Sequence, residues 1–247
     1  TETANSILLH SQHALYIWGA LLHATGGSLR PEKCRWSLIE FGWKKGEPFY
    51  KKINESPGIL TAHNSDRQLE IVRRLEPQTC VEILGVYMNT TGTDEKEFKR
   101  TIGNVEEWNV NMMEGTIFKQ AAHRALRSTI YRTVTYRLPA TQFTPLQCTK
   151  INFNLHRNIL SKMGINNRIA NVYRYAPTAI NGIGLMDVRL EQCISHIMEF
   201  LSHAGRATLN DNIMLAEIEL LQLHSGLSSN LFRLDYNTYH YLLPECE

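Results

Sequence analysis

The sequence predicts an α+β fold that is predominantly α-helical, with a small β unit followed by a helical bundle. Three observations predict it. All strand-like patterns lie within residues 1–90, and apolar residues recur at helical spacing through residues 91–226. Cap residues and glycines divide the second stretch into separate helices. We therefore expect two domains, residues 1–90 and 91–247. With 43% apolar residues, the 247-residue chain is long enough to bury a core.

In the first domain the pattern predicts one helix and several short strands. An apolar stripe predicts a helix over residues 7–24, which Gly26 and Gly27 end. The stripe consists of Leu8, Leu15, Trp18 and Leu22. Alternating residues around a Lys-Lys-Gly turn predict a β-hairpin over residues 34–50. Residues 54–68 are expected to form a loop with at most a short strand, and residues 81–88 a single strand.

In the second domain five helices are expected. They begin at about residues 95, 116, 145, 188 and 209. Thr144, Pro145 and Gln147 give the strongest start signal, a cap, a proline at the first helical position and a glutamine at the third. The stripes expected to face the core in the last two helices are Leu190, Ile194, Ile197 and Leu201, then Ile213, Ala216, Leu220 and Leu223. Residues 181–184 predict a turn. Their Gly-x-Gly lacks a preceding strand and a third glycine, so it does not indicate a nucleotide site.

The distribution of charge is the most informative feature of the sequence. Residues 115–186 contain ten Lys and Arg but no Asp or Glu, although the net charge of the whole chain is only +2. Carboxylates repel phosphates, so a surface that binds a nucleic-acid backbone tends to exclude them. Aromatic residues that could stack on bases are interleaved: Tyr131, Tyr136, Tyr173 and Tyr175. The alternative is that this basic face pairs with the acidic C-terminal segment of the same chain.

Other classes of function find little support in the sequence. Five widely spaced cysteines indicate free thiols in a reducing compartment and an intracellular location, in the nucleus or cytoplasm. His10 and His13 lack further ligands at zinc spacing. No signal peptide or membrane-spanning run is present, so no membrane partner is expected. Hydrolase motifs and a phosphate-binding loop are absent.

Several motifs, in order, resemble reverse transcriptases, the RNA-directed DNA polymerases of eukaryotic retroelements and retrotransposons. Residues 24–34, Ala-Thr-Gly-Gly-Ser-Leu-Arg-Pro-Glu-Lys-Cys, resemble the segment after the catalytic Tyr-x-Asp-Asp turn and its helix. Residues 83–86, Ile-Leu-Gly-Val, are similar to the primer-grip strand. Residues 138–150 and 162–185 resemble two stretches of the thumb, although Asn181 stands where the family has a glycine. The match spans about residues 8–226.

The resemblance implies that residues 1–90 form the rear of the palm and residues 91–247 a helical thumb that grips a primer–template duplex. It implies Lys33 as a candidate general acid near the leaving pyrophosphate. The implied nucleic-acid contacts are Leu84, Gly85, Arg124, Arg127, Tyr131, Lys150, Arg157, Lys162 and Arg168.

The sequence has no Asp-Asp pair, so this chain is not expected to be an active nucleotidyltransferase (transferase) alone. The resemblance places the catalytic aspartates and fingers upstream of Thr1, which makes the chain a fragment. No cofactor or metal site is expected in this chain, and Mg²⁺ only with the missing palm. The expected partners are an RNA/DNA duplex and the missing fingers-palm half. The alternative function is a domesticated helical module that binds protein.

Overall fold

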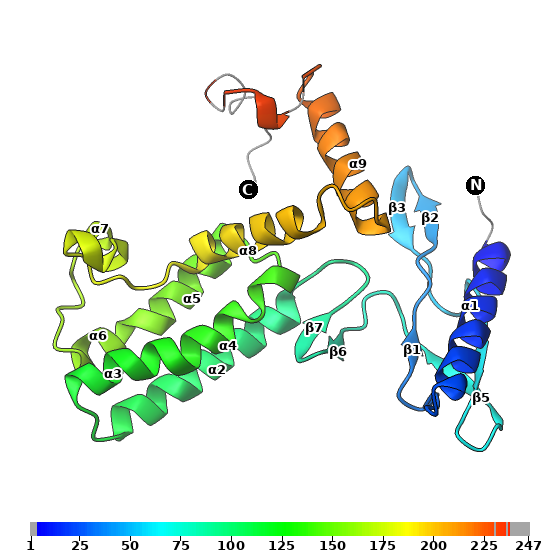
Figure 1. Ribbon diagram of the computed structural model, residues 1–247, viewed down its shortest axis with the longest axis horizontal. Coiled ribbons are helices and arrows are strands. Elements are labelled where there is room, and N and C mark those ends of the chain that lie inside the picture. The colour runs from blue at the N-terminus through cyan, green and yellow to red at the C-terminus, as the bar shows by residue number, and fades with distance from the viewer. Residues whose placement is uncertain (1–3, 230, 236, 238–247) are drawn as a thin grey trace. The chain divides into compact units, whose positions relative to one another are not determined.

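A computed structural model describes residues 4–229, 231–235 and 237 (Figure 1). It is 52% helix and 11% strand, which confirms the predicted α+β, predominantly α class. The chain forms two compact units, residues 1–93 and 94–247.

The first unit is built on a three-stranded sheet covered by one helix. The helix α1 (Ala4–Ala24) packs on β4 (Leu60–His63), which pairs antiparallel with β5 (Leu69–Arg74). The strand β1 (Arg35–Trp36) runs parallel to β5 on its other side. Leu60, Ala62 and Val72 are the buried core of this sheet, and Leu8 and Leu15 pack against it. Trp18, which was expected on the same stripe, is 56% exposed.

A β-hairpin follows, formed by β2 (Phe41–Lys44) and β3 (Glu47–Tyr50). Its turn residues Lys45 and Gly46 have φ of 54° and 86°, the left-handed pair that a two-residue turn requires. The predicted hairpin over residues 34–50 is therefore right about the turn but wrong about the first arm. Trp36 belongs to β1, because its backbone pairs with β5 and its indole N–H donates to the Val72 carbonyl at 3.0 Å.

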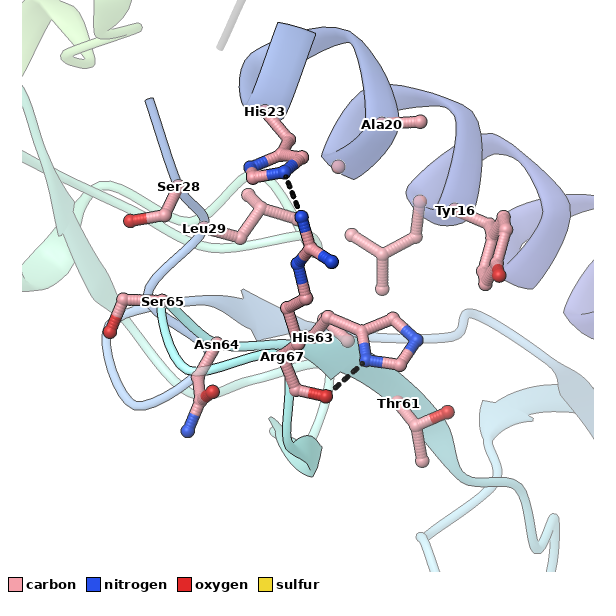
Figure 2. A pocket seen from close by; sticks show the side chains of 13 residues that line it. Tyr16, Ala20, His23, Ser28, Leu29, Thr61, His63, Asn64, Ser65 and Arg67 are labelled. Carbon is pink, nitrogen blue, oxygen red and sulfur yellow. Dashed lines mark hydrogen bonds between the residues drawn. The ribbon is translucent and has the colours of Figure 1, made fainter. Parts of the chain in front are cut away.

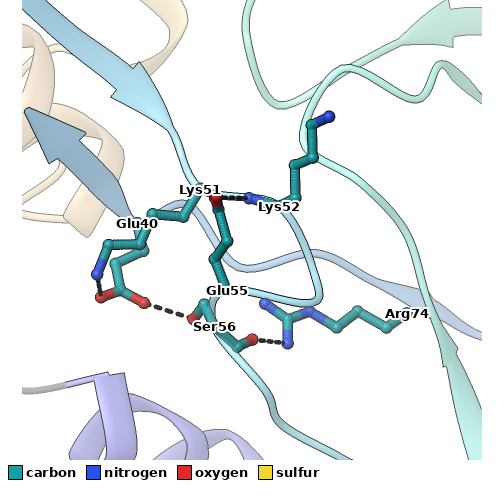
Figure 3. A network of polar contacts seen from close by, with 6 residues as sticks. All are labelled: Glu40, Lys51, Lys52, Glu55, Ser56 and Arg74. Carbon is teal, nitrogen blue, oxygen red and sulfur yellow. Dashed lines mark hydrogen bonds and ion pairs between the residues drawn. The ribbon is translucent and has the colours of Figure 1, made fainter. Parts of the chain in front are cut away.

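A polar network anchors the base of this hairpin (Figure 3). The Glu40 carboxylate accepts from Lys51 and from the Ser56 hydroxyl, and Arg74 of β5 donates to the Ser56 carbonyl. The hydrogen bonds from Lys51 and Ser56 hold the pKa of Glu40 below its usual value. The Arg74 guanidinium also lies 4.9 Å from the Trp36 ring centroid, so the network reaches the edge of the core.

The strand predicted over residues 81–88 is two strands. β6 (Val81–Ile83) and β7 (Val86–Met88) pair antiparallel, with Ile83 opposite Val86. Leu84 and Gly85 between them have φ of 49° and 82°, so the backbone reverses there. The apolar run hid this turn, because a leucine rarely adopts positive φ.

The second unit is a helical bundle (Figure 1). In it α2 (Glu95–Glu114) and α5 (Pro145–Arg157) run alongside a rod, the α3–α4 rod, that consists of α3 (Lys119–Ala125), a π-helical turn and α4 (Tyr131–Thr135). Its further helices are α6 (Ile159–Lys162), α7 (Asn171–Tyr175), α8 (Val188–His203) and α9 (Leu209–His224). A π-helical turn, Leu126–Ile130, joins α3 to α4. Short 3-10 turns lie at Leu138–Ala140, Thr178–Ile180 and Leu231–Arg233. Val105, Leu126, Leu155 and Val188 are fully buried where the helices meet.

The apolar stripes of α8 and α9 do not face the core as predicted. Leu190 and Leu201 of α8 are 59% and 61% exposed, and Ile213 of α9 is 50% exposed. The packed face of α8 carries polar residues instead. The Gln192 amide bonds the backbone N–H and carbonyl of Phe143, each at 3.0 Å. These hydrogen bonds to the loop before α5 fix the rotation of α8, so its aliphatic side chains turn outward.

No helix in the described part of the chain is long and apolar enough to cross a lipid bilayer.

Candidate nucleic-acid interface

Three arginines line one shallow hollow on the outer face of the α3–α4 rod. Arg124, Arg127 and Arg132 share this hollow, of about 400 Å³, with Gln120, His123 and Ser128. The rod turns Ala122, Leu126 and Ile130 inward, so Arg124, Arg127 and Ser128 between them face solvent. No Asp or Glu lines the hollow, as expected from the acid-free stretch in which it lies.

Within this hollow the charge comes from the arginines. Burial, and secondarily the Arg127 charge, lower the pKa of His123, so its imidazole is neutral at neutral pH. Arg127 Nη2 also donates to the Gly184 carbonyl at 3.0 Å, which fixes its side chain against the neighbouring loop. Within the described residues neither Arg124 nor Arg132 has a hydrogen bond of this kind, and both are exposed.

Lys150 and Arg157 of α5 do not line this hollow. Arg157 lines a separate hollow that also contains Glu106 and Glu114 of α2. The Lys150 ammonium lies 5.8 Å from the Phe98 ring centroid, also on α2. Lys150 and Arg157 therefore do not share the hollow of the three arginines, and the carboxylates beside Arg157 oppose phosphate there.

Tyr131 does not belong to a nucleic-acid surface. It is 8% exposed, and its hydroxyl is hydrogen-bonded to His156 Nε2 at 3.1 Å and to the Met186 N–H at 3.2 Å. The prediction that it contacts nucleic acid is wrong, because the π-helical turn and the core packing direct its ring inward.

The two remaining basic candidates of the second unit differ in exposure. Lys162 is half-buried, and its ammonium donates to the Gly115 carbonyl at 3.1 Å. Arg168 is exposed on the loop after α6. Arg137, one of the ten basic residues of the acid-free stretch, is buried against Glu97. The number of basic residues in the sequence is therefore larger than the number that lie on the surface.

The alternative of internal pairing is not seen in the described part of the chain. In residues 187–229, 231–235 and 237, no carboxylate forms an ion pair with Arg124, Arg127, Lys150 or Arg157.

Three candidates lie in the first unit. Lys33 is exposed, at the end of a turn that begins at the buried Pro31. Leu84, 85% exposed, and Gly85 form the tip of the β6–β7 turn rather than part of a strand. A primer end would therefore meet a hairpin tip, not a strand edge.

Gln120, His123, Ser128 and Arg132 also line the hollow on the α3–α4 rod, although none of them was among the predicted nucleic-acid contacts. Arg132 was counted in the acid-free stretch but was not named as a contact, although its spacing of eight residues from Arg124 favours the same helix face.

Comparison with known proteins assigns this chain to no family. Among the residues that the structure describes, no three His, Cys, Asp or Glu side chains are placed to hold a metal ion. No protein-family model matches this chain, and no curated protein or solved structure is significantly similar to it.

Proposed function

We propose that this chain is the nucleic-acid-binding C-terminal portion of a reverse-transcriptase-like polymerase, and that it grips the primer–template duplex. One observation carries the proposal: Arg124, Arg127 and Arg132 converge on one hollow that no carboxylate lines, within a stretch of 72 residues without Asp or Glu. Arginine matches phosphate oxygens in pairs, and such contacts supply affinity and position without choosing a sequence.

The chemistry of such a polymerase would depend on carboxylates outside this sequence. The proposal assigns the aspartates and Mg²⁺ to the missing fingers-palm half. In this chain Lys33 would serve as a general acid, and Leu84 and Gly85 would contact the primer end. The order of motifs in residues 8–226 supports this assignment.

Binding to a fluorescent RNA–DNA hybrid across a salt series tests the proposal. Each phosphate contact adds about 0.9 to the slope of log K against log salt. Replacing both Arg124 and Arg132 with Gln should lower that slope by about two and weaken binding at low salt. Arg127 is kept, because it also holds Gly184. The matched control is Lys99→Gln with Arg206→Gln, which removes the same charge from exposed positions elsewhere in the second unit.

An unchanged slope in the Arg124/Arg132 variant, or no binding by the unmodified chain at low salt, would refute the proposal. A further variant, Lys150→Gln with Arg157→Gln, separates the two hollows. It should change the slope less than the Arg124/Arg132 variant does, because Glu106 and Glu114 flank Arg157.

One observation favours a second function, a helical module that binds protein. The exposed side chains of α8 and α9 include Leu190, Ile197, Leu201, Leu209 and Leu223, from 57% to 74% exposed. Apolar residues of this size rarely gather on a surface without a partner. Such an interface would be insensitive to salt, so the same series distinguishes it from phosphate binding.

A further inference from the structure

A cavity of about 230 Å³ lies in the first unit between α1 and the turn that joins β4 to β5 (Figure 2). Leu15, Ala20 and Leu29 form apolar walls. Gly19 keeps the helix side open, since a Cβ there would lie only 3.2 Å from the Leu29 side chain. The cavity belongs to one unit, so its shape depends only on α1, the adjoining loop and the two strands.

Two histidines and one arginine line this cavity. The Arg67 side chain rises from the turn toward α1, where its Nη2 donates to His23 Nε2 at 2.9 Å (Figure 2). His63 Nδ1 donates to the Arg67 carbonyl at 3.1 Å, so the same residue is held from both sides. The His63 ring meets Tyr16 edge to face, with centroids 5.9 Å apart. The cavity therefore combines a fixed guanidinium with an aromatic wall.

The lining carries positive charge and no carboxylate. Asp66 and Glu70 are close in sequence but do not line the cavity, and the Glu70 carboxylate accepts from the Asn64 amide at 2.6 Å. The polar lining also includes the hydroxyl-bearing residues Ser28, Ser65, Thr61 and Tyr16 and the amide of Asn64. Apolar walls with a few convergent donors are typical of small-molecule sites, and the donors here favour an anion.

The backbone of Arg67 is also unusual. Its φ is 59°, in the left-handed region that a residue of this size seldom occupies. The backbone N–H groups of Asp66 and Gln68 each donate to Asn64 Oδ1 at 2.9 Å, and these two hydrogen bonds close the turn that holds Arg67 there. This conformation aims the guanidinium at the cavity.

We propose that this cavity binds a small organic anion with an aromatic or apolar body, whose carboxylate or phosphate pairs with Arg67. The apolar body would lie between Leu15, Ala20 and Leu29, and the anionic group would face Arg67 and the serine hydroxyls. The site is independent of the α3–α4 hollow, because it lies in the other unit and shares no residue with it.

Chemical-shift mapping of the whole ¹⁵N-labelled chain tests this site with four probes: benzoate, phenyl phosphate, neutral benzyl alcohol and inorganic phosphate. Benzoate or phenyl phosphate should shift the amide resonances of Gly19, Ala20 and Ser65. Which of the two binds more tightly identifies the anionic group. Benzyl alcohol and inorganic phosphate should each bind at least about tenfold more weakly, because each lacks one half of the ligand.

Two variants report on the charge and the space separately. Arg67→Asn keeps a residue that tolerates positive φ and should weaken anion binding about tenfold. Lys45→Asn is its matched control, since Lys45 is also a basic turn residue with positive φ, 54°, and lies outside the cavity. Ala20→Leu, at an exposed helix position, should block binding without changing charge.

Binding that survives both Arg67→Asn and Ala20→Leu would overturn the site, as would shifts confined to other parts of the chain. Equal binding of benzyl alcohol and benzoate would overturn its anion selectivity. Absence of any shift with either aromatic anion would also overturn the proposal.

Discussion

The Tyr131 hydroxyl lies 3.1 Å from Nε2 of His156, in the buried core of the second unit. The Met186 N–H donates to the same hydroxyl at 3.2 Å, which leaves the hydroxyl proton for His156. His156 is 1% exposed. Burial, followed by the charge of Arg174, lowers its pKa to about 4, so the imidazole is neutral and accepts.

The burial of His156 makes the stability of the second unit depend on pH. The folded pKa of His156 is about 4, below the ordinary value of 6.5, so between these values the unfolded chain binds a proton that the folded chain does not. Stability should therefore fall as the pH drops from 6.5 to 4, by about 3 kcal/mol from this residue. Urea titrations followed by resonances of the second unit measure it.

His156→Gln should remove this part of the slope, because glutamine does not titrate. His224→Gln, which changes an exposed histidine of α9, is the control and should keep the wild-type slope. An identical slope in the wild type and in His156→Gln would show that His156 is not held neutral.

The Tyr131 hydroxyl itself should contribute to stability and not to nucleic-acid binding. Tyr131→Phe leaves a buried imidazole nitrogen and the Met186 N–H without their partner, at a cost of about 2 kcal/mol. Tyr173→Phe, at an exposed position of α7, should change the free energy of unfolding by less than about 0.5 kcal/mol. Weaker hybrid binding by folded Tyr131→Phe would contradict the inward position of the ring.

Removing only one partner of the ion pair between Glu97 and Arg137 should lower the free energy of unfolding strongly. Arg137 Nε lies 3.1 Å from Glu97 Oε1, with both side chains buried, and Arg137 Nη1 donates to the Thr101 hydroxyl at 3.1 Å. Glu97→Ala should lower the free energy of unfolding by about 3 to 5 kcal/mol, because it buries an unmatched cation.

A double-mutant cycle checks that reason. Glu97→Leu combined with Arg137→Met should lose less stability than the two single changes added together. Additive losses would mean that the two charges do not interact. Lys99→Ala, which breaks the exposed pair with Glu95, should cost under about 1 kcal/mol.

The β6–β7 turn can be stabilised. Leu84 has φ of 49°, and the next residue is Gly85 with φ of 82°. Asn-Gly is the preferred pair for such a two-residue turn, so Leu84→Asn should stabilise the first unit by about 1 kcal/mol. Gly85→Ala should destabilise it by a similar amount. Thermal unfolding followed by first-unit resonances measures both, and a loss of stability in Leu84→Asn would contradict the turn geometry.

Where one short signal determines the local backbone, the sequence predicted the structure well. The Thr144 hydroxyl accepts from the Gln147 N–H at 3.2 Å, and the Gln147 side chain accepts from the Thr144 N–H at 2.9 Å, as their spacing predicts. The Lys45–Gly46 turn and the helix ends at Gly205 and Gly226 follow from the same kind of local preference.

Features that depend on tertiary packing were not predictable in this way. The rotation of α8 is set by hydrogen bonds from Gln192 to Phe143, 49 residues away in the chain. The strand β5 was missed because Ile71 is 68% exposed while the adjacent Val72 is 3% exposed, which removes the alternation of apolar and polar residues. In the candidate interface, the sequence predicted where the basic stretch lies. It did not predict which side chains of that stretch are buried in the core.

Asn181 and Gly182, in the loop after α7, each restrict which residue types can occupy their positions. Asn181 has φ of 61°, and a Cβ on Gly182 would lie 2.0 Å from the Ala176 carbonyl oxygen. Asparagine is among the few residues that accept left-handed backbone, as glycine does. Either residue at position 181 therefore lets the chain follow the same path. Position 182 allows no such exchange. Over evolutionary time, position 181 can therefore drift between glycine and asparagine, whereas position 182 can change only if the loop is rebuilt.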